Sequence, residues 1–101
     1  MSLEIEKKST TPTVLALSGR LDTATAPKFE TEVFAILPTV DSLILDMSRL
    51  DYISSAGLRV ILKVQKTLAD KDGAVFKLTN VPKTVKEVFD ITGFSDFLNI
   101  E

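Results

Sequence analysis

The alternation of strand-like and helix-like apolar patterns constrains the fold of this chain more than any other feature. Four short stretches have the pattern of β-strands, at residues 3–6, 13–17, 43–45 and 74–78. Three apolar stripes with helical spacing follow the later stretches, at residues 26–37, 58–69 and 85–89. Helices that link successive strands form right-handed crossovers, whereas the first two strands can pair as a hairpin. The order therefore predicts an α/β fold with a mixed, mostly parallel, four- to five-stranded sheet packed against helices.

Glycine and proline residues predict where these elements end. The composition of residues 9–12 predicts a turn, and Gly19 is expected to break the second strand. Pro27 suits the first turn of the first helix because its missing N–H costs nothing there, and Pro38 is expected to end that segment. Gly93 is expected to stop the third helix.

Three further predictions concern burial. The continuous apolar run at residues 13–17 is typical of a strand that is covered on both faces. The second helix is expected to bury an apolar stripe made of Leu58, Ile61, Leu62, Leu68 and Ala69. The last apolar side chains of the sequence are expected to cover the core, namely Phe94, Phe97, Leu98 and Ile100.

The length of 101 residues predicts one domain over residues 1–101. No apolar run approaches the roughly 20 residues that cross a bilayer, and the first residues lack the apolar stretch of a signal peptide. We therefore expect a cytoplasmic protein without direct membrane contact, present as a monomer or a weak dimer.

The chain contains no cysteine and no histidine. These absences remove disulfides, thiolate metal sites, the commonest general base and the Ser-His-Asp triad. The net charge of −2 argues against nucleic-acid binding that rests on phosphate neutralisation. Composition therefore favours a binding or switching protein, without a metal or a cofactor, over an enzyme.

The segment most relevant to function, residues 46–60, follows a predicted buried strand and opens the second helix. Partners of α/β sheets usually dock at such carboxyl ends of strands. Ser54 and Ser55 lie at or just before the helix N-terminus, where serine is a preferred cap worth about 0.5–2 kcal/mol over alanine. Free N–H groups and the helix dipole would also favour a phosphate on Ser55 there. Capping and switching are compatible, and both interpretations stay open.

Residues around these serines also have more than one interpretation. Tyr52 either closes the end of the core or presents an apolar ring with a polar tip at an interface. Gly57 lowers helix propensity, which either close approach of a partner or tight packing on the sheet would explain. Residues 47–54 are predicted to form a loop, with Asp46 just before it and Asp51 within it. Two carboxylates without further ligands make a poor metal site, so we expect them to be solvated loop residues.

Three segments, in the right order, resemble the STAS-domain anti-sigma factor antagonists. Residues 52–58 resemble the phosphorylation loop of that family, which reads aromatic, apolar, Asp, Ser, Ser or Thr, Gly, Leu. When the two are aligned on Gly57 and Leu58, the phosphoacceptor of the family falls on Ser55. Residues 19–22 are similar to the Gly-Glu-Leu-Asp turn of the family, and residues 88–94 are similar to its C-terminal Leu-Phe-Asp-x-x-Gly-Leu segment.

This resemblance implies a single STAS domain that acts as a partner switch. An ATP-using anti-sigma factor with serine kinase activity would phosphorylate Ser55 and would then no longer bind this chain. A phosphatase of the PP2C class would reverse the modification, and the unphosphorylated form would bind the anti-sigma factor and free the sigma factor. The chain would be a substrate and regulator rather than an enzyme. The resemblance places on the partner-facing side Asp22, Thr23, Tyr52, Ser54, Ala56, Gly57, Leu58 and Arg59.

Two positions depart from the family pattern. Ser54 stands where the family has Asp, which makes Ser54 an alternative acceptor, although the register through Gly57 selects Ser55. Arg59 stands in place of a small residue, and it would either pair with a phosphate or remain a solvated helix residue. Asp22 either caps the first helix or faces the partner, and these two roles are compatible.

Two other functions remain as alternatives. STAS-like modules also occur as phosphorylation-independent subunits of transport and signalling complexes, and such a module would tolerate changes at Ser55. A small hydrolase with Ser54 or Ser55 as nucleophile would need a lysine or carboxylate as base, and none is spaced near the segment to suggest one.

Overall fold

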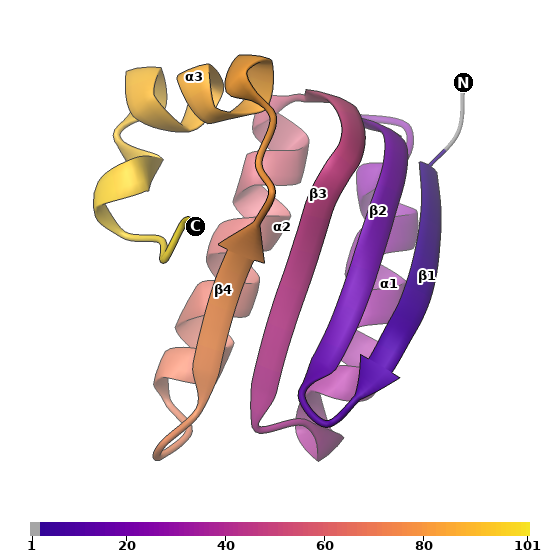
Figure 1. Cartoon of the computed structure of the whole chain (residues 1–101), viewed down its shortest axis with the longest axis vertical. Coiled ribbons are helices and arrows are strands. Elements are labelled where there is room, and N and C mark those ends of the chain that lie inside the picture. Colours follow the sequence, from indigo (N-terminus) through magenta and orange to yellow (C-terminus); the bar gives the residue numbers. More distant parts are fainter. Residues whose placement is uncertain (1–2) are drawn as a thin grey trace.

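A computed structural model of the chain describes residues 3–101 and contains one four-stranded sheet (Figure 1). The strands lie in the order β1-β2-β3-β4, with bounds Leu3–Thr10, Thr13–Leu21, Ser42–Ile53 and Val75–Thr79. Strand β1 pairs antiparallel with β2, whereas β2 with β3 and β3 with β4 are parallel. The predicted mixed, mostly parallel sheet is therefore confirmed.

Three α-helices accompany the sheet: α1 (Ala26–Ile36), α2 (Ser55–Ala69) and α3 (Lys83–Thr92). Short 3-10 helices follow α1 and α3, at Leu37–Thr39 and Phe94–Asp96. Helices α1 and α2 lie side by side behind the sheet, and α3 lies near the ends of β3 and β4 (Figure 1). Within residues 3–101, no helix is long and apolar enough to span a membrane.

The face of the sheet that turns away from α1 and α2 is open. Along β2 the side chains of Leu15 and Leu17 are buried, while Val14 and Ala16 between them are only half-buried. Ala16 pairs with Asp46, and Glu6 pairs with Ala16, so charged side chains share that outer face. The prediction that the second strand is covered on both faces is wrong, because both long helices pack on the same side.

Strands β2 and β3 are longer than their sequence patterns predict. Gly19, expected to break β2, lies inside it with φ 103°, and β3 continues through the segment expected to be a loop. Irregularities in the β2–β3 register fall between Ala16 and Ser18 and between Gly19 and Arg20. These bulges disturb the alternation of side chains, so the buried residues late in β3 recur every third position, at Met47, Leu50 and Ile53. A period-two search therefore misses the second half of this strand.

Helix α2 buries most of the predicted stripe. Leu58, Ile61 and Leu68 are buried as expected, together with Val60 and Val64, whereas Ala69 is exposed at the end of the helix.

The third helix and the C-terminal segment agree in part with prediction. Gly93 ends α3 in the left-handed conformation with φ 80°, as expected for a helix C-cap. Leu98 is buried, but Phe97 is 66% exposed, so the prediction that Phe97 covers the core is wrong. The backbone N–H of Leu78 donates to the carbonyl of Asn99, which ties the C-terminus to β4 and directs Leu98 rather than Phe97 to the core.

Candidate functional site

The junction between β3 and α2 consists of a single residue. Strand β3 ends at Ile53, and α2 begins at Ser55 and runs for 15 residues. Between them Ser54 has the extended backbone of an N-cap, with φ −104° and ψ 175°. The backbone N–H of Ser54 donates to the carbonyl of Leu21 at 2.9 Å, and the N–H of Leu58 donates to the carbonyl of Ser54 at 3.0 Å. Backbone hydrogen bonds therefore fix the junction from both sides.

The two serines differ in accessibility. The side chain of Ser55 is exposed as the first residue of α2. The hydroxyl oxygen of Ser54 is buried and has no hydrogen-bond partner within residues 3–101. Ser54 thus occupies the N-cap position, but its side chain makes no capping hydrogen bond, contrary to the capping interpretation.

Gly57 is required by packing in the first turn of α2. A Cβ atom built on Gly57 would lie 2.6 Å from Cγ of Leu21 and 3.1 Å from Cγ1 of Ile53. Tight packing on the ends of β2 and β3 is therefore sufficient to explain this glycine. Leu58 is only 3% exposed. Gly57 and Leu58 therefore lie on the buried side of the first turn of α2, and Ser55 and Arg59 lie on its exposed side.

A cluster of Arg20, Asp22 and Tyr52 lies at the carboxyl ends of β2 and β3. Arg20 and Tyr52 pair across the two strands, and the guanidinium carbon of Arg20 lies 4.2 Å from the centroid of the Tyr52 ring. Nε of Arg20 is also 3.6 Å from Oδ2 of Asp22. The sequence indicated Tyr52 and Asp22 but not Arg20. The one local signal was the two-residue spacing of Arg20 and Asp22, which is compatible with their contact on one face of an extended chain.

Asp22 organises the turn that precedes α1. Its Oδ1 accepts hydrogen bonds from the backbone N–H groups of Ala24 and Thr25, both at 3.0 Å, and from the Thr25 hydroxyl at 3.2 Å. The N-cap assigned to α1 is Thr25, but the side chain of Thr25 makes no capping hydrogen bond. Asp22 makes the capping contacts one turn earlier, because its carbonyl oxygen also accepts from the N–H of Ala26 at 2.8 Å, so the capping interpretation of Asp22 is supported. The backbone hydrogen bond from Thr25 is the main cause that lowers the pKa of Asp22, with smaller help from the charge of Arg20. Asp22 is therefore ionised at neutral pH.

A groove of about 230 Å³ runs between α1 and α2 beside the junction. Nζ of Lys63 and Oε2 of Glu30, 2.6 Å apart, bridge the two helices at this groove. Arg59 is exposed at its edge and makes no hydrogen bond or ion pair with the part of the chain that the structure describes. The complete lining consists of Thr23, Ala26, Pro27, Glu30, Ala56, Arg59, Val60 and Lys63. Three predicted partner-facing residues, Thr23, Ala56 and Arg59, thus meet in one groove that the sequence did not indicate.

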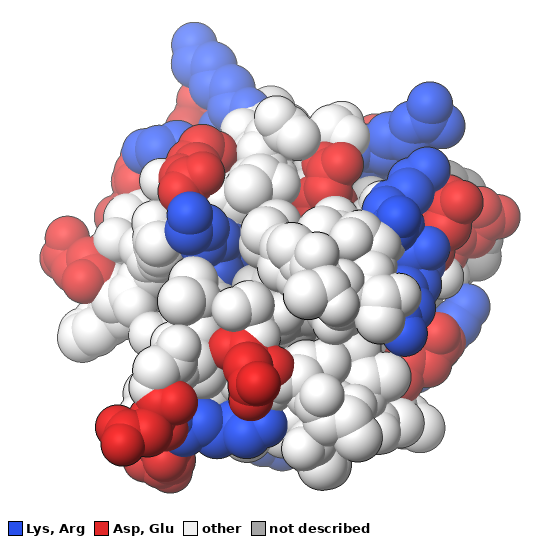
Figure 2. Space-filling model, turned by 60° about the horizontal axis from the view of Figure 1, so that its bottom comes forward, with Lys and Arg blue, Asp and Glu red and all other residues white. Residues whose placement is uncertain are grey.

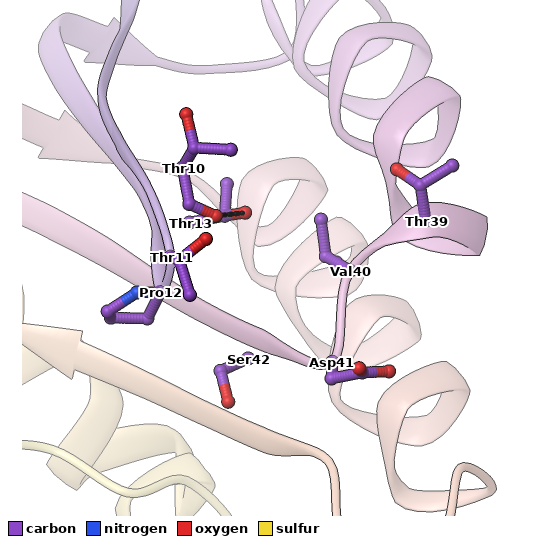
Figure 3. Close-up of a pocket in the computed structure, with 8 residues that line it drawn as sticks. All are labelled: Thr10, Thr11, Pro12, Thr13, Thr39, Val40, Asp41 and Ser42. Carbon is purple, nitrogen blue, oxygen red and sulfur yellow. Dashed lines mark hydrogen bonds between the residues drawn. The ribbon is translucent and has the colours of Figure 1, made fainter.

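A pocket of about 490 Å³ lies at the opposite end of the strands (Figure 3). It lies between the β1–β2 turn and the segment that leads into β3, and four threonines, one serine and a single carboxylate, Asp41, contribute to its lining. Figure 2 brings this end forward and shows cations and anions scattered around a wide uncharged area. This face therefore has no concentrated charge of one sign.

Asp46 and Asp51 lie within β3 rather than in a loop. Burial raises the pKa of Asp46, but hydrogen bonds from the backbone of Ser48 and the side chain of Asn80 outweigh it, so the pKa is lowered overall. Among the described residues, no group of three or more His, Cys, Asp or Glu side chains is arranged to hold a metal ion.

Comparisons with known proteins show what this chain is similar to. A family model described as STAS domain matches residues 2–101. A candidate anti-sigma factor antagonist of Bordetella bronchiseptica, BtrV, is 42% identical over 82 residues, which cover 80% of this chain and 70% of the relative.

Solved structures share the fold. The crystal structure of an anti-sigma factor antagonist from Mycobacterium paratuberculosis superposes with a TM-score of 0.87 at 19% identity, covering 97% of this chain and 84% of the other. The phosphorylated form of the Bacillus cell fate determinant SpoIIAA gives a TM-score of 0.73 at 20% identity, covering 98% of this chain and 90% of the other.

Proposed function

This chain belongs to the STAS-domain family of anti-sigma factor antagonists, and from that premise we propose that phosphorylation of Ser55 switches its binding to an anti-sigma factor. The unphosphorylated form binds an anti-sigma factor that is also a serine kinase, and a sigma factor is released. Phosphorylation ends this binding, and a phosphatase of the PP2C type restores it. The chain acts by binding, and the kinase supplies the ATP and the catalysis.

The observation that carries this proposal is the difference between the two adjacent serine hydroxyls. Ser55 is an exposed residue at the start of α2, whereas the hydroxyl oxygen of Ser54 is buried. A kinase can therefore reach Ser55 without unfolding the junction. The phosphate would meet the free N–H groups and positive dipole end of α2, which favour an anion. SpoIIAA, which has the same fold, has been solved in a phosphorylated form, and this supports the proposal.

The switch acts through charge at a docking surface. We define this surface by the exposed side chains around the junction, which are Thr23, Tyr52, Ser55 and Arg59. A phosphate adds about −1.5 to −2 charges at neutral pH. A partner that binds the neutral hydroxyl would then face a strongly hydrated anion, and the cost of removing water from this anion opposes burial of the surface.

Phosphopeptide mass spectrometry of residues 49–63, on protein isolated from its native cells in several growth states, tests the proposal. We expect phosphate on Ser55 in amounts that vary with growth state. The kinase purified through its activity on this chain should bind Ser55→Ala persistently and Ser55→Asp weakly. Equal affinity of wild type and both variants for that kinase contradicts the switch.

The Ser54 position favours a second candidate, a phosphorylation-independent STAS module of a transport or signalling complex. The junction has no acidic side chain where the family pattern has Asp, so a carboxylate that would orient the acceptor hydroxyl is missing. Unmodified peptide in every growth state, together with a complex that tolerates both Ser55→Ala and Ser55→Asp, would favour this candidate.

A further inference from the structure

We propose that Arg59 is the intramolecular partner of the phosphate on Ser55. In this mechanism phosphorylation adds negative charge and also withdraws a cation from the groove between α1 and α2. The inference rests on the proposed function in taking Ser55 as the phosphoacceptor, and it assigns a regulatory role to an arginine that departs from the family pattern.

The positions of the two residues on α2 permit a direct contact. Ser55 and Arg59 are four residues apart on the same helix, and both side chains are exposed. Residues at this spacing lie about 5–6 Å apart at Cβ on the same helix face. The anion would precede the cation along the helix, which is the better order for such pairs. A guanidinium group can also bind two phosphate oxygens at once.

Arg59 is available for this role, whereas the neighbouring cations are occupied. Arg20 contacts Asp22 and stacks on the ring of Tyr52. Lys63 pairs with Glu30 at 2.6 Å. In the span from residue 3 to residue 101, no anion competes for Arg59, so a phosphate would not have to displace an existing partner.

The charges of the groove indicate what binds there before phosphorylation. Arg59 and Lys63 contribute two positive charges and Glu30 one negative charge, which leaves a net charge of +1. A partner segment with an acidic side chain complements this charge. A phosphate of about −1.5 to −2 reverses the sign of the groove and occupies Arg59. The acidic segment of the partner then loses its attraction and meets repulsion, which is an effective way to reject a ligand.

A titration of the phosphate tests the pairing without any partner protein. Phosphoserine is incorporated genetically at position 55, and its second pKa is measured by ³¹P NMR in wild type, Arg59→Gln and Arg49→Gln. Arg49 is the matched control, because it is an exposed arginine on β3 that lines a different pocket. We expect this pKa to be about 0.2–0.4 units higher in Arg59→Gln than in the other two proteins. High salt should reduce the difference. Equal pKa values in all three proteins overturn the pairing.

Binding measurements test the docking part separately. With the kinase purified through its activity on this chain, Arg59→Gln should weaken binding of the unphosphorylated protein about two- to fivefold, and Arg49→Gln should not. Equal binding of wild type and Arg59→Gln overturns the acidic-partner part. The proposed function fails by a different result, which is equal binding of Ser55→Ala and Ser55→Asp. The NMR result does not depend on that outcome, because the phosphate is installed without a kinase.

Discussion

The backbone N–H of Ser54 donates a 2.9 Å hydrogen bond to the carbonyl oxygen of Leu21, which joins the end of β2 to the start of α2. The side chain of Leu21 also fills the space into which a Cβ atom of Gly57 would project. Leu21 therefore fixes the first turn of α2 through both its backbone and its side chain. Because Asp22 is the next residue after Leu21, the same hydrogen bond holds the start of the turn before α1 beside the N-cap residue of α2.

Replacement of Gly57 by alanine should destabilise the protein, although helix propensity alone predicts the opposite. Alanine would gain up to about 1 kcal/mol from propensity. The Cβ contact of 2.6 Å with Leu21 forces a shift in a packed region, and overpacking costs about 1–3 kcal/mol. We expect a net loss in the free energy of unfolding, measured by urea denaturation. Ser55→Ala, at an exposed neighbouring position, is the control and should change stability little; a more stable Gly57→Ala would contradict the packing explanation.

Replacement of Ser54 by alanine should stabilise the protein by about 0.5–1 kcal/mol. The buried hydroxyl oxygen of Ser54 has no partner within residues 3–101, and an unsatisfied buried group costs about 1–3 kcal/mol. A side chain that capped α2 would instead cost about 0.5–2 kcal/mol on removal. Urea denaturation therefore distinguishes the two roles by the sign of the change, and a clear loss of stability would show that Ser54 caps the helix.

Asp22 should make stability depend on pH in the acidic range. Its pKa in the folded protein is lowered below the usual 3.8, mainly by the backbone hydrogen bond from Thr25. Its contribution is therefore present above the unfolded pKa and is lost as the pH falls through the lower folded pKa. Thermal unfolding from pH 7 to pH 2 should show a smaller acid-induced loss in Asp22→Asn than in wild type. Asp51→Asn, an exposed position on β3, is the control, and curves of equal slope for both variants would contradict the prediction.

Tyr52 should contribute to binding more than to folding. Its ring is 41% exposed and is held in place by Arg20 at 4.2 Å. A rigid, exposed aromatic side chain at an interface is a common centre of binding energy. We expect Tyr52→Ala to weaken binding to the purified kinase about tenfold, whereas Tyr52→Phe retains most of the affinity. Isothermal titration calorimetry measures both, and full affinity in Tyr52→Ala would remove Tyr52 from the docking surface.

Local sequence patterns were sufficient for the order of the elements and for several of their ends. The helical stripe of α2 and the C-cap at Gly93 follow from spacing and from glycine conformation, and both are present. The late part of β3 was not predictable in this way, because bulges in the β2–β3 register break the period-two pattern. Phe97 shows the same limit, since only the tertiary contact of Leu78 with the C-terminal backbone decides that its neighbour Leu98 is the buried one.

The candidate site was predictable by position but not by environment. The resemblance selected Ser55 over Ser54 by register alone, and the structure adds that the two hydroxyls differ in exposure. The contacts of Arg20 with Tyr52 and of Lys63 with Glu30 join residues more than 30 positions apart, so no local pattern could indicate them. The same is true of the groove in which Arg59 lies.

The junction between β3 and α2 is a single residue long, so the backbone has little freedom to move next to the proposed site of modification. Ser54 is held by backbone hydrogen bonds on both sides, and Gly57 is wedged against Leu21 within the first turn. The proposed phosphorylation of Ser55 would therefore change the charge at this junction rather than its backbone conformation. A partner would then distinguish the two states of this protein by the local electrostatic potential. No refolding step would be needed in each cycle of modification.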